Sequence, residues 1–113
     1  MTKLEHNPFV LGYKQLVKLS EQAIKDTPMP NLAHGLKIWP LYFDDVRTGR
    51  KTFEIRENDR DFHTGDTLVL NEWDNERQLY TGRSVKVKVT YLLRGGSHGL
   101  HEDFVALGIK RID

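Results

Sequence analysis

The sequence contains no cysteine, which excludes disulfide bonds and thiolate chemistry. It also lacks any apolar run long enough to span a membrane, and its first residues lack the basic-then-apolar pattern of a signal peptide. Internal repeats and low-complexity tracts are absent as well. We therefore expect a cytoplasmic protein that makes no contact with a membrane.

Neither sign of charge dominates the sequence. The chain has 17 Lys and Arg against 16 Asp and Glu, so its formal net charge at pH 7 is +1. Such a chain is no general binder of polyanions, and a nucleic-acid site must arise from where individual charges lie. A length of 113 residues, with 38% hydrophobic and 29% charged residues, is typical of one globular domain. We expect a monomer that needs no cofactor.

The first part of the chain predicts a helix followed by a linker. Apolar residues recur at helical spacing across residues 9–24. Asn7 with Pro8 is a start signal, and Pro28 with Pro30 ends the helix. We therefore divide the chain into an N-terminal helix with a Pro-rich linker, residues 1–31, and a main domain, residues 32–113.

The main domain shows the alternation of β-strands. Strands are predicted at residues 33–38, 52–56, 67–73, 83–93 and 104–112, separated by turn-forming residues. Short β connections and one short helix predict an α+β fold in which five or six strands curl into a partial barrel. The side chains expected in its core are Phe53, Ile55, Leu68, Leu70, Val87, Val89, Leu107 and Ile109.

The short helix is predicted within the segment WPLYFDDVRTG. Pro40 suits a first helical position and Gly49 a C-terminal cap. Leu41, Tyr42 and Val46 are expected to form its buried side. Trp39 lies at the corner between strand and helix, where core packing is the ordinary role.

The segment GRKTFEIR, from Gly49 to Arg56, is the central candidate site. On an alternating strand, Phe53 and Ile55 face the core while Glu54 and Arg56 share the opposite face. Lys51 and Glu54 would leave opposite faces unless a bulge brings them into one cleft. The ordinary alternative is a surface ion pair that contributes about 0.2–1 kcal/mol.

Basic residues with aromatic neighbours recur around this segment. Single-stranded RNA needs both, because cations contact phosphates and flat side chains stack on bases. Trp39 or Trp73 would supply such stacking, and the glycine-rich loop RGGSHG would allow close backbone approach. His98 and His101 are too few ligands to predict a metal site. The candidate nucleic-acid-binding residues are Lys37, Trp39, Arg50, Lys51, Glu54, Arg56, Arg60, Arg94 and His98.

Several of these motifs resemble one family. LKIWP, YFDDVRTGRKTFEIR, NDRDF, GDTLVLNEWD, TGR, VTYLL and the GG–G loop follow one another from Leu36 to Gly99. Their order resembles the ASCH domains of the PUA-like superfamily and, more narrowly, the bacterial and phage group DUF3850. The resemblance covers the chain from about Ala33 to Ile112. It implies a PUA-like β-barrel with helices at its ends and a cleft beside Lys51 that recognises RNA or a modified nucleoside.

The resemblance leaves three functions open. Our first expectation is an RNA- or nucleotide-binding module. One ASCH branch hydrolyses N4-acetylcytidine with a K-x-x-T motif and a distant glutamate. Lys51 matches that lysine, Glu54 stands at the threonine position, and Glu102 is a candidate for the glutamate. An amidohydrolase with Lys51 and Glu54 as catalytic residues is thus the alternative, although Glu54 favours binding. The third possibility is a phage-associated protein-interaction module.

Overall fold

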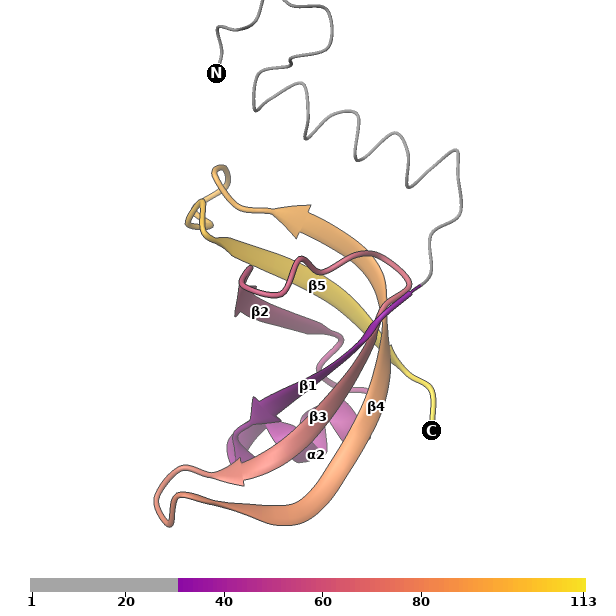
Figure 1. Cartoon of the computed structure of the whole chain (residues 1–113), viewed down its shortest axis with the longest axis vertical. Helices are drawn as coiled ribbons and strands as arrows, with labels where there is room; N and C mark the ends of the chain where they lie inside the picture. Colours follow the sequence, from indigo (N-terminus) through magenta and orange to yellow (C-terminus); the bar gives the residue numbers. More distant parts are fainter. Residues whose placement is uncertain (1–30) are drawn as a thin grey trace, which may run out of the picture. The chain divides into compact units, whose positions relative to one another are not determined.

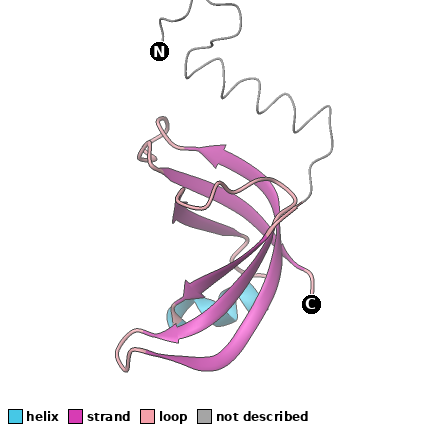
Figure 2. Ribbon diagram, in the orientation of Figure 1, coloured by secondary structure: helices cyan, strands magenta, loops and turns pink. Residues whose placement is uncertain are grey.

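The structure, a computed structural model, describes residues 31–113. These residues form one five-stranded sheet with the strand order β1-β3-β4-β5-β2 and one short helix, as Figures 1 and 2 show. The predicted N-terminal helix and the linker through Pro30 lie outside the described residues. The elements are β1 (Ala33–Ile38), α2 (Pro40–Arg47), β2 (Phe53–Glu57), β3 (Thr67–Asp74), β4 (Leu79–Arg94) and β5 (Phe104–Arg111).

The sheet is curled into a half-barrel, and β1 and β2 form its two edges. β1 pairs with β3 in parallel, whereas the other three pairs are antiparallel. The long strand β4 bends along its length, and its register with β5 shifts between Val89 and Tyr91. Such irregularities increase the local twist and bend a strand, which lets one sheet wrap around its own core. The fold class predicted from the sequence is thus confirmed as a small, curled, barrel-like sheet.

The core fills the concave side of this sheet. Of the eight side chains predicted to be buried, the six on β3, β4 and β5 are confirmed, each at most 6% exposed. Burial of a side chain of this size contributes about 1.5–3 kcal/mol. Four further strand residues, two from α2 and one from the loop after β2 complete the core: Leu36, Ile38, Val85, Val105, Phe43, Val46 and Phe62.

The helix buries a different face from the one predicted. Pro40 begins α2 as expected, and the segment after the helix turns at Gly49, whose φ is +83°. Phe43 and Val46 are its buried residues, whereas Leu41 and Tyr42 are exposed. The helical spacing of three residues pairs Phe43 with Val46, so the prediction that placed Leu41 and Tyr42 inside was wrong.

Strand β2 is turned over relative to the prediction. Phe53 and Ile55 are 49% and 53% exposed, whereas Glu54 between them is only 4% exposed. The alternation itself is confirmed, but its assignment to the core was wrong. The inner face of this edge strand carries a carboxylate, and two cations accompany it, as described below. No helix within residues 31–113 is long and apolar enough to cross a membrane.

Candidate binding cleft at the open seam of the half-barrel

The two edge strands face each other across a seam that arginine side chains bridge. Arg56 on β2 donates from Nη2 to the carbonyl oxygen of Lys37 on β1, at 2.6 Å. Arg60, in the loop after β2, donates from Nη1 to the carbonyl of Gly35 at 2.8 Å. Both carbonyls lie on the edge of β1 that no strand pairs with. The arginines therefore satisfy edge groups that would otherwise be open to another strand.

A buried carboxylate lies beside this seam. Glu54 Oε2 accepts a hydrogen bond from Lys51 Nζ at 2.6 Å, and Oε1 accepts one from Arg56 Nε at 2.9 Å. Arg56 Nη2 also lies 2.8 Å from Oε1. The Glu54 side chain is 5% exposed, and those of Lys51 and Arg56 are 18% and 23% exposed. One carboxylate thus fixes two cations, and the group keeps a net charge of +1.

No bulge is needed to bring Lys51 to Glu54. Lys51 precedes β2, and its backbone N–H donates to the carbonyl of Asp45 at the end of α2. Its ammonium group reaches over the first residue of the strand and also donates to the Phe53 carbonyl at 2.8 Å. The expectation that Lys51 and Glu54 share a face only through a bulge was therefore wrong, because the strand begins two residues after Lys51.

Aromatic side chains surround the ion-pair group and form a cleft of about 430 Å³. The rings of Trp39 and Tyr42 are nearly parallel, with an interplanar angle of 13° and centroids 6.4 Å apart. Lys51 Nζ lies 5.3 Å from the centre of the Tyr42 ring and 4.9 Å from that of Phe53. Trp39 is 52% exposed, so the core role considered for it from the sequence was wrong. The residues that line this first cleft are Lys37, Ile38, Trp39, Tyr42, Lys51, Phe53, Glu54, Ile55 and Arg56.

A second cleft of about 440 Å³ continues along the seam. Lys37 and Arg56 line both clefts. Lys37 Nζ lies 3.8 Å from the centre of the Trp73 ring, a cation–π contact, and Tyr80 packs edge-on against that ring. The residues that line the second cleft are Gly35, Leu36, Lys37, Arg56, Glu57, Asp59, Arg60, Phe62 and Tyr80.

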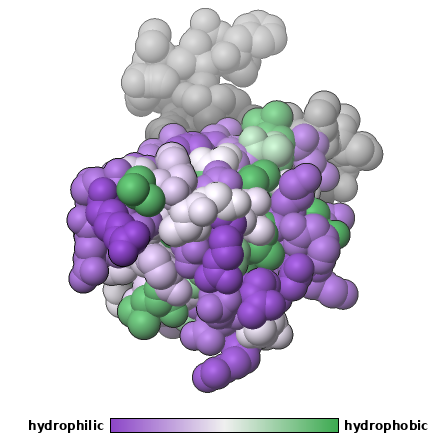
Figure 3. Space-filling view, turned by 90° about the horizontal axis from the view of Figure 1, so that it is seen from below, coloured by the Kyte–Doolittle hydropathy of each residue, from purple (hydrophilic) through white to green (hydrophobic). Residues whose placement is uncertain are grey.

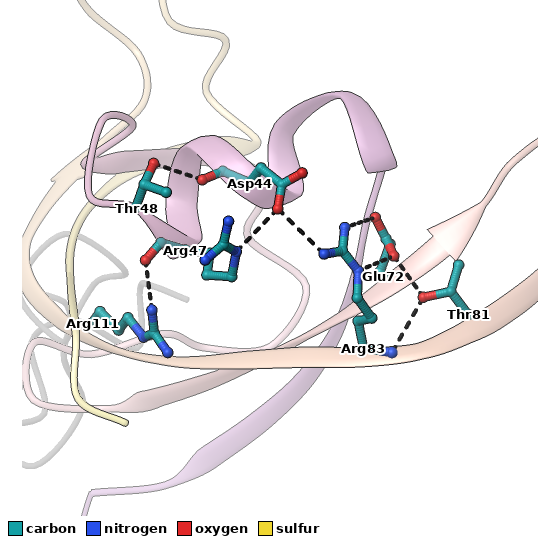
Figure 4. Close-up of polar contacts among 7 residues, drawn as sticks. All are labelled: Asp44, Arg47, Thr48, Glu72, Thr81, Arg83 and Arg111. Atoms are coloured by element: carbon teal, nitrogen blue, oxygen red, sulfur yellow. Dashed lines mark hydrogen bonds and ion pairs between the residues drawn. The ribbon is translucent and has the colours of Figure 1, made fainter.

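The helix that supplies Tyr42 is held to the sheet by Arg83, as Figure 4 shows. Arg83 donates to both oxygens of Glu72 on β3, each at 3.0 Å, and to Asp44 on α2 at 3.3 Å. Its guanidinium also lies 4.4 Å from the centre of the buried Phe43 ring. These contacts fix α2 against β3 and β4, and they fix the orientation of the aromatic wall.

The charged side chains of this network shift one another's pKa values. Hydrogen bonds from Arg83 lower the pKa of Glu72. The pKa of Asp44 is lowered by its hydrogen bond with Arg47, and further by the one with Arg83. The pKa of Arg83 is raised, chiefly by Glu72. All three groups are therefore charged at neutral pH, and the anchor of α2 is electrostatic.

A second buried pair holds the beginning of β1. His34 Nε2 lies 2.8 Å from Asp66 Oδ2, and Asp66 also accepts the backbone N–H groups of Leu32 and His63. The His34 ring packs edge-on against Phe62 at 4.9 Å. Within residues 31–113, no three side chains of the metal-ligating types converge on one point.

The structure brings most of the predicted site residues together. Lys37, Trp39, Lys51, Glu54, Arg56 and Arg60 all line one of the two clefts. The other three lie elsewhere. Arg50 is highly exposed with Asp45 at 3.8 Å, Arg94 ends β4, and His98 lies in the glycine-rich loop. None of these three lines either cleft, so their part in binding stays a prediction.

Among the lining residues that the sequence analysis missed, four are exposed aromatic or apolar side chains: Tyr42, Phe53, Ile55 and Tyr80. No sequence signal identified Tyr42, because it lies four residues before Val46 and Phe43 lies three, and both spacings fit one face of a helix. No signal existed for Phe53 and Ile55 either. Apolar residues that alternate with charged ones predict an inward apolar face in almost every amphipathic strand.

The exposed apolar side chains outside the clefts form separate patches. Figure 3 shows one face of the molecule, on which separate apolar patches interrupt a mainly hydrophilic surface. Among the described residues, Tyr91 and Leu93 on β4 are 67% and 41% exposed. Across β5 their registered neighbours are Gly108 and Ala106, which pair in turn with Phe53 and Ile55 on β2. Four large apolar side chains thus share one outer face of the sheet.

The fold and cleft define a class of small, curled β-sheet domains with an ion-pair group at an open seam. The sequence model of one family, the domain of unknown function DUF3850, matches residues 33–109. The chain belongs to this family, which confirms the narrower part of the resemblance. It is also 42% identical over 57 residues to an "Uncharacterized 12.9 kDa protein in GpA 3'region" of Escherichia phage P2. That match covers 50% of this chain and 50% of the phage protein, and it makes this chain phage-related.

Proposed function

We propose that this domain binds single-stranded RNA or a nucleotide in the first cleft. The observation that carries the proposal is the position of Glu54. Its carboxylate is buried, yet it holds Lys51 and Arg56 at the floor of a cleft with aromatic walls. A structural ion pair alone needs no exposed aromatic rim, whereas a nucleotide needs a flat surface for its base and cations for its polar groups.

The floor still has donors to offer to a ligand. Lys51 Nζ carries three N–H groups and uses two of them, on Phe53 and Glu54. Arg56 Nη1 makes no hydrogen bond with any residue among 31–113. Both groups are thus available to a phosphate oxygen or a base carbonyl. Glu54 restricts where they point, and such preorganisation favours one ligand orientation.

The proposed function also agrees with a particular superfamily of folds. We propose that the domain is a PUA-like fold of the ASCH type, with residues 32–113 as the folded unit and a cytoplasmic location. The supporting observations are the curled sheet, the order of the motifs and the cleft beside Lys51.

The test is a titration with mixed-sequence single-stranded RNA at two salt concentrations. Trp39→Ala should weaken binding by about 5- to 150-fold, because loss of one stacked base costs about 1–3 kcal/mol. Tyr91→Ala is the matched control, since it removes an exposed aromatic ring that lines neither cleft. Equal effects of the two variants would contradict the proposal.

Substitution of the two cations at the cleft floor is a second test of binding in the first cleft. Lys51→Ala and Arg56→Ala should each weaken binding, and the loss should shrink as salt rises, because cations act on phosphates partly through counterion release. Arg77→Ala removes an exposed cation of the β3–β4 turn and should have little effect. Binding that neither salt nor these variants change would exclude the cleft.

The enzyme alternative also has a supporting observation. Lys51 Nζ lies at the cleft floor and is only partly exposed, as a catalytic amine would be. Two of its three N–H groups, however, already donate to the Phe53 carbonyl and to Glu54, which holds the amine in place and opposes a role as nucleophile. Prolonged incubation with N4-acetylcytidine tests this alternative. Turnover that Lys51→Ala abolishes, without salt-dependent RNA binding, would replace the binding proposal.

A protein-interaction role stays a prediction. Its surface would be the outer face with Phe53, Ile55, Tyr91 and Leu93. If the protein neither binds RNA nor turns over N4-acetylcytidine, and the cleft variants remain folded, this third function is favoured.

A further inference from the structure

The two clefts are neighbours, since Lys37 and Arg56 line both, and we call them together the groove. The first cleft has an aromatic wall made by Trp39 and Tyr42. The second has an aromatic side chain of its own, Tyr80, which is 55% exposed. Two aromatic surfaces therefore flank a central stretch of the seam, and that stretch is cationic.

The central stretch presents two guanidinium groups at a fixed spacing. Arg56 and Arg60 donate to the carbonyls of Lys37 and Gly35, which lie two residues apart on one strand edge. Two residues of a strand span about 6.6 Å. One phosphate that lies between two guanidinium groups at about this spacing can accept a hydrogen bond from each of them.

Each of these guanidinium groups has a nitrogen left for a ligand. Arg56 uses Nε and Nη2 on Glu54 and Lys37, and Arg60 uses Nη1 on Gly35. Arg56 Nη1 and Arg60 Nη2 make no hydrogen bond within the described part of the chain. Because the bonds to β1 hold the planar groups in place, little entropy is lost when they bind an anion.

The charge of the whole groove fits one phosphodiester. Its four cations are Lys37, Lys51, Arg56 and Arg60. Its three carboxylates are Glu54, Glu57 and Asp59, and Asp59 lies 3.9 Å from Arg60. The net charge is therefore +1, which one phosphodiester neutralises. The carboxylates of the second cleft also disfavour a terminal phosphate, whose charge is larger than that of a diester.

We infer that the ligand is an RNA strand of at least two nucleotides, with one base in each cleft and the linking phosphate at Arg56 and Arg60. This inference rests on the proposed function and extends it, because a free nucleoside would fill only the first cleft. Tyr80 contacts the second base, and Arg60 contacts the phosphate alone.

The experiment compares nucleosides with dinucleoside monophosphates by isothermal titration of the full chain. The probes are the four ribonucleosides and the four homodinucleoside monophosphates. The best dinucleoside monophosphate should bind at least about tenfold tighter than its nucleoside, since it gains one stacked base and one phosphate contact. Equal affinity of the two would overturn the inference.

Arg60→Gln is the diagnostic variant, because glutamine still has an N–H group for the Gly35 carbonyl but loses the charge. It should weaken binding of the dinucleoside monophosphate by about fivefold and change the affinity for the nucleoside by less than about twofold. Tyr80→Ala should show the same selective loss, and Arg77→Gln, which makes the same charge change in an exposed turn, should alter neither affinity. Thermal melting confirms that each variant is folded.

Two outcomes separate the inference from the proposal on which it rests. If nucleosides bind and Arg60→Gln weakens nucleoside and dinucleoside monophosphate alike, the single-cleft proposal survives and the inference fails. If no probe binds, and mixed-sequence RNA does not bind either, both fail together.

Discussion

Glu54→Gln should destabilise the fold and, at the same time, tighten the binding of RNA. The carboxylate accepts hydrogen bonds from Lys51 and Arg56 at 2.6 and 2.9 Å. Glutamine keeps one acceptor oxygen but places an NH₂ group against one of the two cations. The variant therefore leaves a donor facing a donor and two positive charges without a counterion.

The magnitude follows from burial. Removal of one partner from a fully buried pair costs about 3–5 kcal/mol, and a hydrogen bond to a charged group contributes about 1.5–3 kcal/mol. Lys51 and Arg56 are 18% and 23% exposed, so water recovers part of the loss. We expect Glu54→Gln to lower the free energy of unfolding by about 2 kcal/mol, or the Tm by about 10 °C for a domain of this size.

Thermal and urea unfolding measure the stability, with Glu76→Gln as the control. Glu76 is an exposed residue of the β3–β4 turn, so its replacement makes the same charge change without a buried partner. Glu76→Gln should change the free energy of unfolding by less than about 0.5 kcal/mol.

Binding should move in the opposite direction. Loss of the carboxylate raises the charge of the ion-pair group from +1 to +2, so Glu54→Gln should bind mixed-sequence RNA more tightly at low salt and less so at high salt. If Glu54 also reads a base edge, preference between sequences should fall. A variant as stable as wild type, or one with weaker RNA binding at low salt, would refute this account of Glu54.

Three further predictions concern the scaffold. The pKa of Glu72 is lower in the folded protein than its ordinary value of about 4.5, so the ionised carboxylate stabilises the fold above that pH. This stabilisation is lost as the pH falls through the lower pKa of the folded state. The stability of Glu72→Gln should therefore depend less on pH in acid than that of wild type. Gly95→Ala should cost more than about 2 kcal/mol in urea unfolding, because its Cβ would overlap the His101 carbonyl oxygen, whereas Gly35→Ala should be mild. A chain that begins at Asn31 should still unfold cooperatively by circular dichroism, because residues 31–113 contain a complete sheet and core; a chain without secondary structure would contradict this.

Much of the sheet was predictable because its inner strands obey one rule. Val87 and Val89 alternate with lysines, and Leu107 and Ile109 repeat the pattern on β5. Strands with neighbours on both sides bury one face and expose the other, so their alternation identifies the core correctly. The edge strand β2, which pairs with β5 on one side, does not obey this rule, and there the prediction of the buried face was wrong.

The site was predictable as a set of residues but not as an arrangement. Lys51, Glu54 and Arg56 were singled out as members of one segment, GRKTFEIR, and they do lie together. Spacing along the chain could not show that the Arg56 guanidinium reaches the carbonyl of Lys37, 19 residues earlier in the sequence. That contact depends on how far the sheet curls, which is set by the twist and register of all five strands together.

The inverted face of β2 and the cleft have one physical cause, the incomplete closure of the sheet. A closed barrel would pair β1 with β2 and satisfy their edge groups by backbone hydrogen bonds. Here the two edges stay apart, and Arg56 and Arg60 satisfy the β1 carbonyls instead. Arg56 has its counterion in Glu54, two residues earlier on the same face of β2, so Glu54 points inward and Phe53 and Ile55 point outward. Incomplete closure thus explains the charged floor of the cleft and its apolar rim together.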